Sequence, residues 1–160
     1  MRKVRFDMWG AAAAAALLAG CGTISGWIHR PPPAVAQPLP VPGFVQSVSL
    51  SGANEVPPVE TKASGTGNVI VNPDRSVIAT VTVTGMTATA AHIHMGPIGG
   101  NGPVIVPLTK SGDNTFTAPA GMKITQEQYA AFEKGDTYVN VHSDAHKSGE
   151  IRAQLKGPGS

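Results

Sequence analysis

Histidines are the residues of this sequence whose type and spacing suggest chemistry. Four of the five histidines fall in two tight groups: His92, His94, His142 and His146. Residues i and i+2 of a β-strand point to the same face, so His92 and His94 present two imidazoles side by side if their segment is a strand. The second group adds His142 at the end of another expected strand and His146 in the loop after it. Three or four imidazoles converge if the two strands lie close together.

Converging imidazoles form a site that suits copper or zinc, and three histidines with an open coordination position suit a reactive metal. We therefore predict a copper or zinc site that uses His92 and His94 with at least one of His142 and His146. Asp144 and Glu150 are candidate acceptors for the outer N–H groups of these rings. The alternative is structural: a strand His-X-His pair hydrogen-bonds buried backbone, and a loop histidine holds the loop in place.

Other polar residues suggest structure rather than catalysis. Glu55, in the segment NEVPP, has no visible partner for general acid–base chemistry. The glycine-rich segment 96–102 is not followed by Lys-Ser/Thr, which excludes a P-loop. Neither Ser51 nor Ser143 lies in a nucleophile elbow.

The segments around these histidines are predicted to form β-strands. Residues 77–84 alternate Val or Ala with Ile or Thr, the period-2 pattern of a strand. Further strands are expected at 44–50, 67–71, 91–95, 103–108, 114–117, 137–142 and 149–155. One helix is predicted at 126–134, with Thr125 as its N-cap and Gln128 completing a capping box. Together these elements predict an all-β fold, an antiparallel Greek-key β-sandwich with one short helix.

The N-terminus has the features of an exported lipoprotein. Arg2, Lys3 and Arg5 precede an apolar run that ends in Leu-Ala-Gly before Cys21, and that run is too short to span a bilayer. This segment resembles a bacterial lipobox, so residues 1–20 are expected to be a signal peptide and Cys21 the acylated residue. Gly22 after the cysteine favours the periplasmic side of the outer membrane as the location.

Four regions follow from this reading of the chain. After the signal peptide, residues 21–43 comprise the lipidated cysteine and a proline-rich tether, 44–156 form one domain and 157–160 a short tail. Cys21 is the only cysteine, so an internal disulfide is excluded. Cleavage would remove three of the 12 basic and one of the 10 acidic residues, leaving a formally neutral chain. Nucleic acid is therefore not an expected partner, whereas the lipid bilayer is.

Three separated motifs resemble the CHRD domain, a family first named from chordin and common in bacterial exported proteins. The motifs are LSGANEVPPV at 50–59, AHIHMG at 91–96 with NGPV at 101–104, and YVNVH at 138–142 with GEIRAQ at 149–154. Ala153 stands where the family often has glycine. The resemblance spans about 46–155 and implies a β-sandwich, but it does not define the function. Our leading prediction is a membrane-anchored, extracytoplasmic CHRD binding module with copper as its small ligand.

A second and weaker resemblance is to copper/zinc superoxide dismutases, which bind copper through a His-X-His pair and two further histidines. It implies that His92 and His94 match the pair and that His142 or His146 supplies the rest. No zinc-ligand loop or disulfide pair is present, and Arg152 is only a distant candidate for an active-site arginine. A copper-only dismutase-like enzyme and a metal-free structural or adhesion domain therefore stand as alternatives to the binding module.

Overall fold

The computed structural model describes residues 42–159. The predicted signal peptide, Cys21 and nearly all of the predicted tether lie outside the described residues. Within the described part of the chain, no helix is long and apolar enough to cross a membrane.

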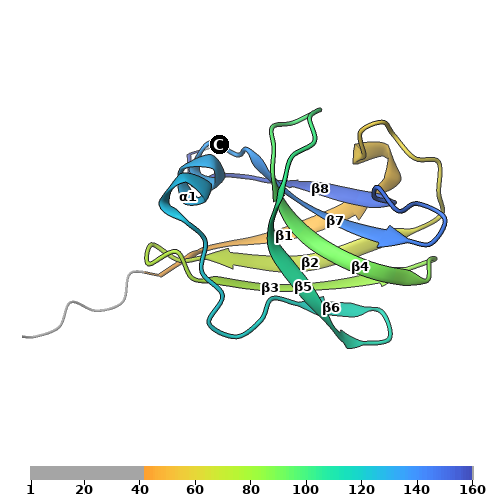
Figure 1. The fold of residues 1–160 in the computed structure, drawn as a ribbon, viewed down its shortest axis with the longest axis horizontal. Coiled ribbons are helices and arrows are strands. Elements are labelled where there is room, and N and C mark those ends of the chain that lie inside the picture. Colours follow the sequence, from red (N-terminus) through yellow and green to blue (C-terminus); the bar gives the residue numbers. More distant parts are fainter. Residues whose placement is uncertain (1–41, 160) are drawn as a thin grey trace, which may run out of the picture. The chain divides into compact units, whose positions relative to one another are not determined.

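Eight antiparallel strands close into a barrel in the order β1-β2-β3-β6-β5-β4-β7-β8 (Figure 1). In chain order the elements are β1 (Phe44–Ser51), the 3-10 turn η1 (Gly52–Asn54), β2 (Ser64–Val71), β3 (Val77–Thr84), β4 (Ala88–Met95), β5 (Val104–Gly112), β6 (Thr115–Thr117), α1 (Gln126–Glu133), β7 (Thr137–Ser143) and β8 (Ile151–Leu155).

The all-β class, the antiparallel pairing and the single α-helix of the described residues confirm the sequence-based expectation, but a closed barrel replaces the two-sheet Greek-key sandwich. The barrel closes where β1 meets β8, with Ser51 opposite Arg152. On the other side, the short strand β6 pairs with both β3 and β5. Closure depends on contacts between strands far apart in the sequence, which period-2 patterning of single strands does not specify.

The core fills the barrel with aliphatic side chains. In β3 the odd-numbered residues from Val77 to Val83 are buried and the even-numbered residues face solvent. Each fully buried valine stabilises the fold by about 1.5–3 kcal/mol relative to an exposed one. The alternation predicted for residues 77–84 is therefore the inside–outside pattern of a barrel wall.

The helix α1 begins at the predicted residue and ends at Glu133, one residue before the predicted end. The Thr125 hydroxyl accepts a hydrogen bond from the Gln128 N–H, and the Gln128 side chain accepts one from the Thr125 N–H. Phe132 is 1% exposed and packs against Phe44 at the start of β1, with ring centroids 5.9 Å apart. The helix thus covers the end of the barrel where β1 begins.

Strand β7 departs from the alternation, because all seven of its residues are buried. Val139 and Val141 belong to the apolar core. Tyr138, Asn140 and His142 share the opposite face, as the sequence predicts for a strand, and loops of the chain cover that face. The barrel therefore has a second buried region, polar in character, on the outside of its wall.

Candidate metal centre

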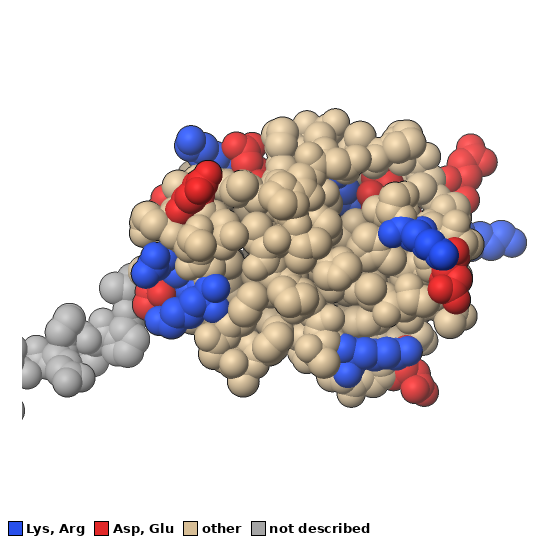
Figure 2. Space-filling view, viewed as in Figure 1, with Lys and Arg blue, Asp and Glu red and all other residues tan. Residues whose placement is uncertain are grey.

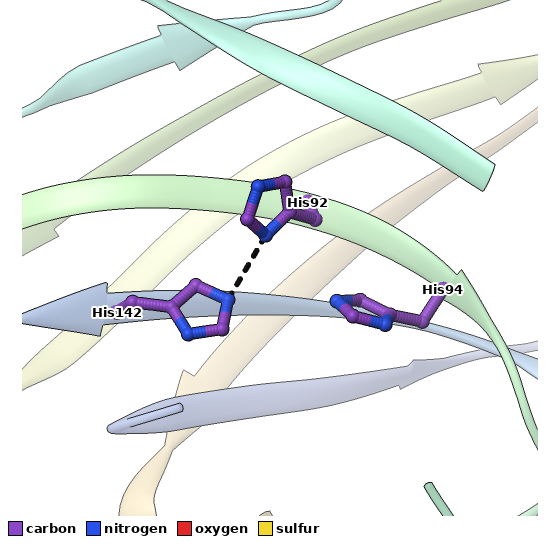
Figure 3. Close-up of side chains that lie close together, drawn as sticks. All are labelled: His92, His94 and His142. Atoms are coloured by element: carbon purple, nitrogen blue, oxygen red, sulfur yellow. Dashed lines mark hydrogen bonds between the residues drawn. The ribbon is translucent and has the colours of Figure 1, made fainter. Parts of the chain in front are cut away.

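Three of the four predicted ligands meet on this polar face. His92 and His94 lie on β4, and His142 lies on the neighbouring strand β7, where it is opposite Ala90. One ring nitrogen from each histidine lies within 4.8 Å of the other two (Figure 3). Two nitrogens bound to one metal at ~2.0–2.1 Å can be up to ~4.2 Å apart, so a rearrangement of about half an ångström would complete a site.

The three rings are already in contact. His92 Nδ1 lies 3.0 Å from His142 Nε2, and this is the hydrogen bond drawn in Figure 3. The ring centroids are 4.9 Å apart for His92 and His142, 5.6 Å for His92 and His94, and 6.4 Å for His94 and His142. Replacing the shared proton of the first pair with a cation would free one nitrogen of each ring for coordination.

Backbone carbonyls fix the orientation of two of these rings. His94 Nδ1 donates to the Gly102 carbonyl at 2.8 Å, and His142 Nδ1 donates to the Lys147 carbonyl at 3.0 Å. A carbonyl only accepts, so each Nδ1 carries the proton and each Nε2 carries the lone pair that binds metals. Within residues 42–159, His94 Nε2 is buried and has no hydrogen-bond partner.

Burial keeps the rings in the neutral, ligating form. It lowers the pKa of His92, and the neighbouring His142 and His94 lower it further. It also lowers the pKa of His142, against the opposing effect of the Lys147 carbonyl. The pKa of His94 is likewise lowered by burial, against the Gly102 carbonyl and the nearby Asn140 amide, while Arg152 lowers it further.

His146 lies outside the group of three. It is half-buried in the loop after β7, and its N–H donates to the Ser143 hydroxyl at 3.2 Å. Its carbonyl accepts from the Ser143 N–H at 3.4 Å, so the residue contributes to the turn that carries Lys147 toward His142. The structure therefore gives His146 a part in shaping the loop over the site.

The expected carboxylate acceptors are replaced by backbone. Asp144 is exposed on the loop after β7. Glu150 is buried, but its oxygens accept from the Thr61 hydroxyl at 2.7 Å and from the Ser143 hydroxyl rather than from an imidazole. The acceptors that orient the rings are main-chain carbonyls from two loops. The residue types of the sequence do not predict which carbonyl each ring contacts.

Tyr138 and Arg152 form a support that sequence reasoning missed. The Tyr138 ring is stacked on His94 with centroids 4.8 Å apart and planes 7° apart. The guanidinium carbon of Arg152 lies 3.4 Å from the centroid of the Tyr138 ring. The Tyr138 hydroxyl accepts from the Gly102 N–H at 3.3 Å. The stack and this hydrogen bond hold His94 and its carbonyl partner together.

Arg152 also holds the loop 96–103 against the barrel. It donates to the Asn101 side chain at 3.1 Å, to the Pro97 carbonyl at 3.2 Å and to the Gln154 side chain at 3.0 Å. With 1% exposure, its guanidinium does not face solvent as a group that attracts an anionic substrate would. Figure 2 shows acidic and basic side chains interspersed along the edge of one face, with no large patch of one sign.

The comparisons with known proteins place this chain in a family. The model of the CHRD domain matches residues 46–155, which include β4, β7 and β8 and all three histidines of the candidate metal centre. Comparison with curated proteins and with solved structures gives no match. The match covers most of the chain, and the chain therefore belongs to the CHRD domain family.

Proposed function

We propose that this CHRD domain is a binding module that holds one copper ion through His92, His94 and His142. The observation that carries the proposal is the convergence of three ring nitrogens within 4.8 Å. Two of the three rings have their Nδ1–H fixed by carbonyls, so little reorganisation is needed to present Nε2 to a metal.

The ligand chemistry favours copper. Three neutral imidazoles without a carboxylate or thiolate form a nitrogen-only donor set. Among divalent first-row ions the affinity of such a set is highest for Cu²⁺, and imidazole also suits zinc. His94 and His142 are each 9% exposed while His92 is half-buried, so a ligand or a copper donor approaches from the His92 side.

The buried lone pair of His94 supports binding over a purely structural role. A structural histidine on a strand satisfies both ring nitrogens, because an unpaired buried polar atom costs about 1–3 kcal/mol. His94 satisfies Nδ1 only. A metal ion at the centre of the three rings supplies the missing partner.

We further propose that the domain is held at the cell envelope by acylation of Cys21, on the periplasmic side of the outer membrane. The support is the apolar run before Leu-Ala-Gly-Cys, followed by a proline-rich segment that separates the cysteine from the domain. A copper-binding module in this location would meet the metal outside the cytoplasm.

The proposal is tested by copper titration of the full chain carrying Cys21→Ser, which removes a competing thiol. We expect one copper bound per chain and complete loss of binding in the double variant His92→Gln, His94→Gln. The matched control is His146→Gln, which changes a histidine of the same region outside the group of three and is expected to retain the affinity. Absence of copper binding in the unsubstituted site, with a lower melting temperature in the double variant, would instead establish a structural role.

A further inference from the structure

Arg152 brings a positive charge into the buried region beside the three histidines. Its side chain is 1% exposed, and within the described residues it donates hydrogen bonds to neutral acceptors on Asn101, Pro97 and Gln154. Within residues 42–159 no carboxylate lies within ion-pair distance of the guanidinium. The charge therefore acts on its surroundings without neutralisation by direct contact.

The strand order holds this charge close to a metal ligand. Strand β7 lies between β4, which carries His94, and β8, which carries Arg152. From β7, Tyr138 stacks on His94 at 4.8 Å and receives the Arg152 guanidinium at 3.4 Å from its ring centroid. The three side chains form a layered stack whose geometry fixes the separation between the positive charge and the metal centre.

A fixed positive charge distinguishes the two oxidation states of copper. It repels Cu(II) more strongly than Cu(I), because Coulomb repulsion grows with the charge of the ion, and burial limits screening by solvent. We propose that the charge of Arg152 shifts the oxidation-state preference of the bound copper toward Cu(I). The Tyr138–His94 stack holds this charge at a fixed distance from the metal centre. This inference rests on the proposed copper site and adds its redox preference.

Glu55 supplies the opposing charge. Its side chain is 6% exposed, and its Oε1 atom has no hydrogen-bond partner in the described part of the chain. Burial raises the pKa of the Glu55 carboxyl, and the charge of Arg152 opposes that rise. The isosteric change Glu55→Gln leaves the arginine charge less compensated, so it should move the preference further toward Cu(I). Arg152→Met should move it the other way. Loss of structure would weaken the affinities for both ions and would not give opposite signs.

The test measures the dissociation constants of Cu(I) and Cu(II) separately, by competition with chromophoric chelators at about pH 8, well above the usual pKa of a carboxyl group. The protein is the full chain carrying Cys21→Ser, with Arg152→Met, Arg152→Lys and Glu55→Gln as variants. Arg152→Lys is the control that keeps the charge. We expect Arg152→Met to change the ratio of the two constants by about tenfold in favour of Cu(II), a lowering of the potential by ~59 mV. Glu55→Gln should change the ratio in favour of Cu(I).

Three outcomes separate the hypotheses. Opposite shifts in Arg152→Met and Glu55→Gln, with the Arg152→Lys ratio near that of the unsubstituted site, support the inference. Copper binding with an unchanged ratio in the variants that fold overturns it while leaving the copper site in place. Failure of the unsubstituted site to bind either ion overturns the copper site itself. If Arg152→Met does not fold, the sign measured for Glu55→Gln decides.

Discussion

Tyr138 lies parallel to His94, with ring centroids 4.8 Å apart and an angle of 7° between the planes. Removing only the hydroxyl of this tyrosine tests which of its contacts matters. Tyr138→Phe keeps the stack and loses the hydrogen bond from the Gly102 N–H. We expect the free energy of unfolding to fall by about 1 kcal/mol, measured by urea denaturation, because one net hydrogen bond is lost.

The larger truncation Tyr138→Ala is the comparison for this variant. Tyr138 is 2% exposed, so removing its ring leaves a cavity and costs about 3–5 kcal/mol. Copper affinity should fall only slightly in the phenylalanine variant and strongly in the alanine variant, since only the latter releases the His94 ring. Equal copper affinities in the two variants would show that the stack does not position the ligand.

Acid should destabilise the metal-free domain through the three imidazoles. Burial lowers the pKa of His92, His94 and His142, whereas unfolded histidines take up a proton near pH ~6.5. Between these pKa values the unfolded state binds more protons than the folded state, so the free energy of unfolding falls as the pH drops below ~6.5. The loss levels off once the folded rings are protonated.

Denaturation between about pH 7.5 and pH 5.5 checks this dependence in a range above the usual carboxyl pKa values. His94→Gln removes one of the three rings and should make the dependence shallower. Copper affinity should fall over the same range, because protons compete for the ring lone pairs. Stability that does not change with pH in this window would contradict the assigned burial of the rings.

Local signals in the sequence were sufficient for part of the fold and part of the site. The His-X-His spacing alone places His92 and His94 on one face of a strand, because side chains alternate with period 2. The Thr125–Gln128 capping box predicts the start of α1 in the same way, since both partners lie within one helical turn. These features depend on neighbours in the chain, and the structure contains them as expected.

Long-range features could not be predicted from the same signals. His142 reaches His92 because β4 and β7 pair with a particular register, which shifts between Ala88 and Ala90. The carbonyl of Gly102 reaches His94 because a loop folds back over the barrel wall. A residue type does not encode which carbonyl it will meet, and strand periodicity does not encode whether the sheet closes.

The barrel core should not tolerate a charge at Val81. This residue is fully buried in β3, and Val81→Asp would place an unpaired carboxylate among aliphatic side chains. We expect the domain to unfold, seen as loss of the cooperative thermal transition. The control is Thr82→Asp on the exposed face of the same strand, which should change the free energy of unfolding by less than about 1 kcal/mol. A folded Val81→Asp variant would be inconsistent with the assigned face of β3.

Membrane attachment should depend on the cysteine that follows the apolar N-terminal run. Cys21→Ser removes the thiol that acylation requires, so the chain should move from the membrane fraction to the soluble fraction on cell fractionation. The fold of residues 44–156 should be unchanged, because the apolar core of the domain is formed by residues within that range. Retention of the variant in the membrane after a high-salt wash would refute the proposed lipid anchor.

Gly102 tests the coupling between the loop 96–103 and the metal centre. A side chain at this position would place its Cβ 1.7 Å from the carbonyl oxygen of Met95, so Gly102→Ala must displace the backbone. The same residue accepts the His94 Nδ1–H and donates to the Tyr138 hydroxyl, so the displacement frees the ligand ring. Loss of an outer partner of a ligating histidine typically lowers metal affinity by about 10–100-fold, and we expect a loss in that range by copper titration.

The control is Gly99→Ala in the same loop, where a Cβ meets nothing within 4 Å and the positive φ of 74° costs only about 1 kcal/mol of strain. Unchanged copper affinity in Gly102→Ala would show that the carbonyl does not orient the ligand.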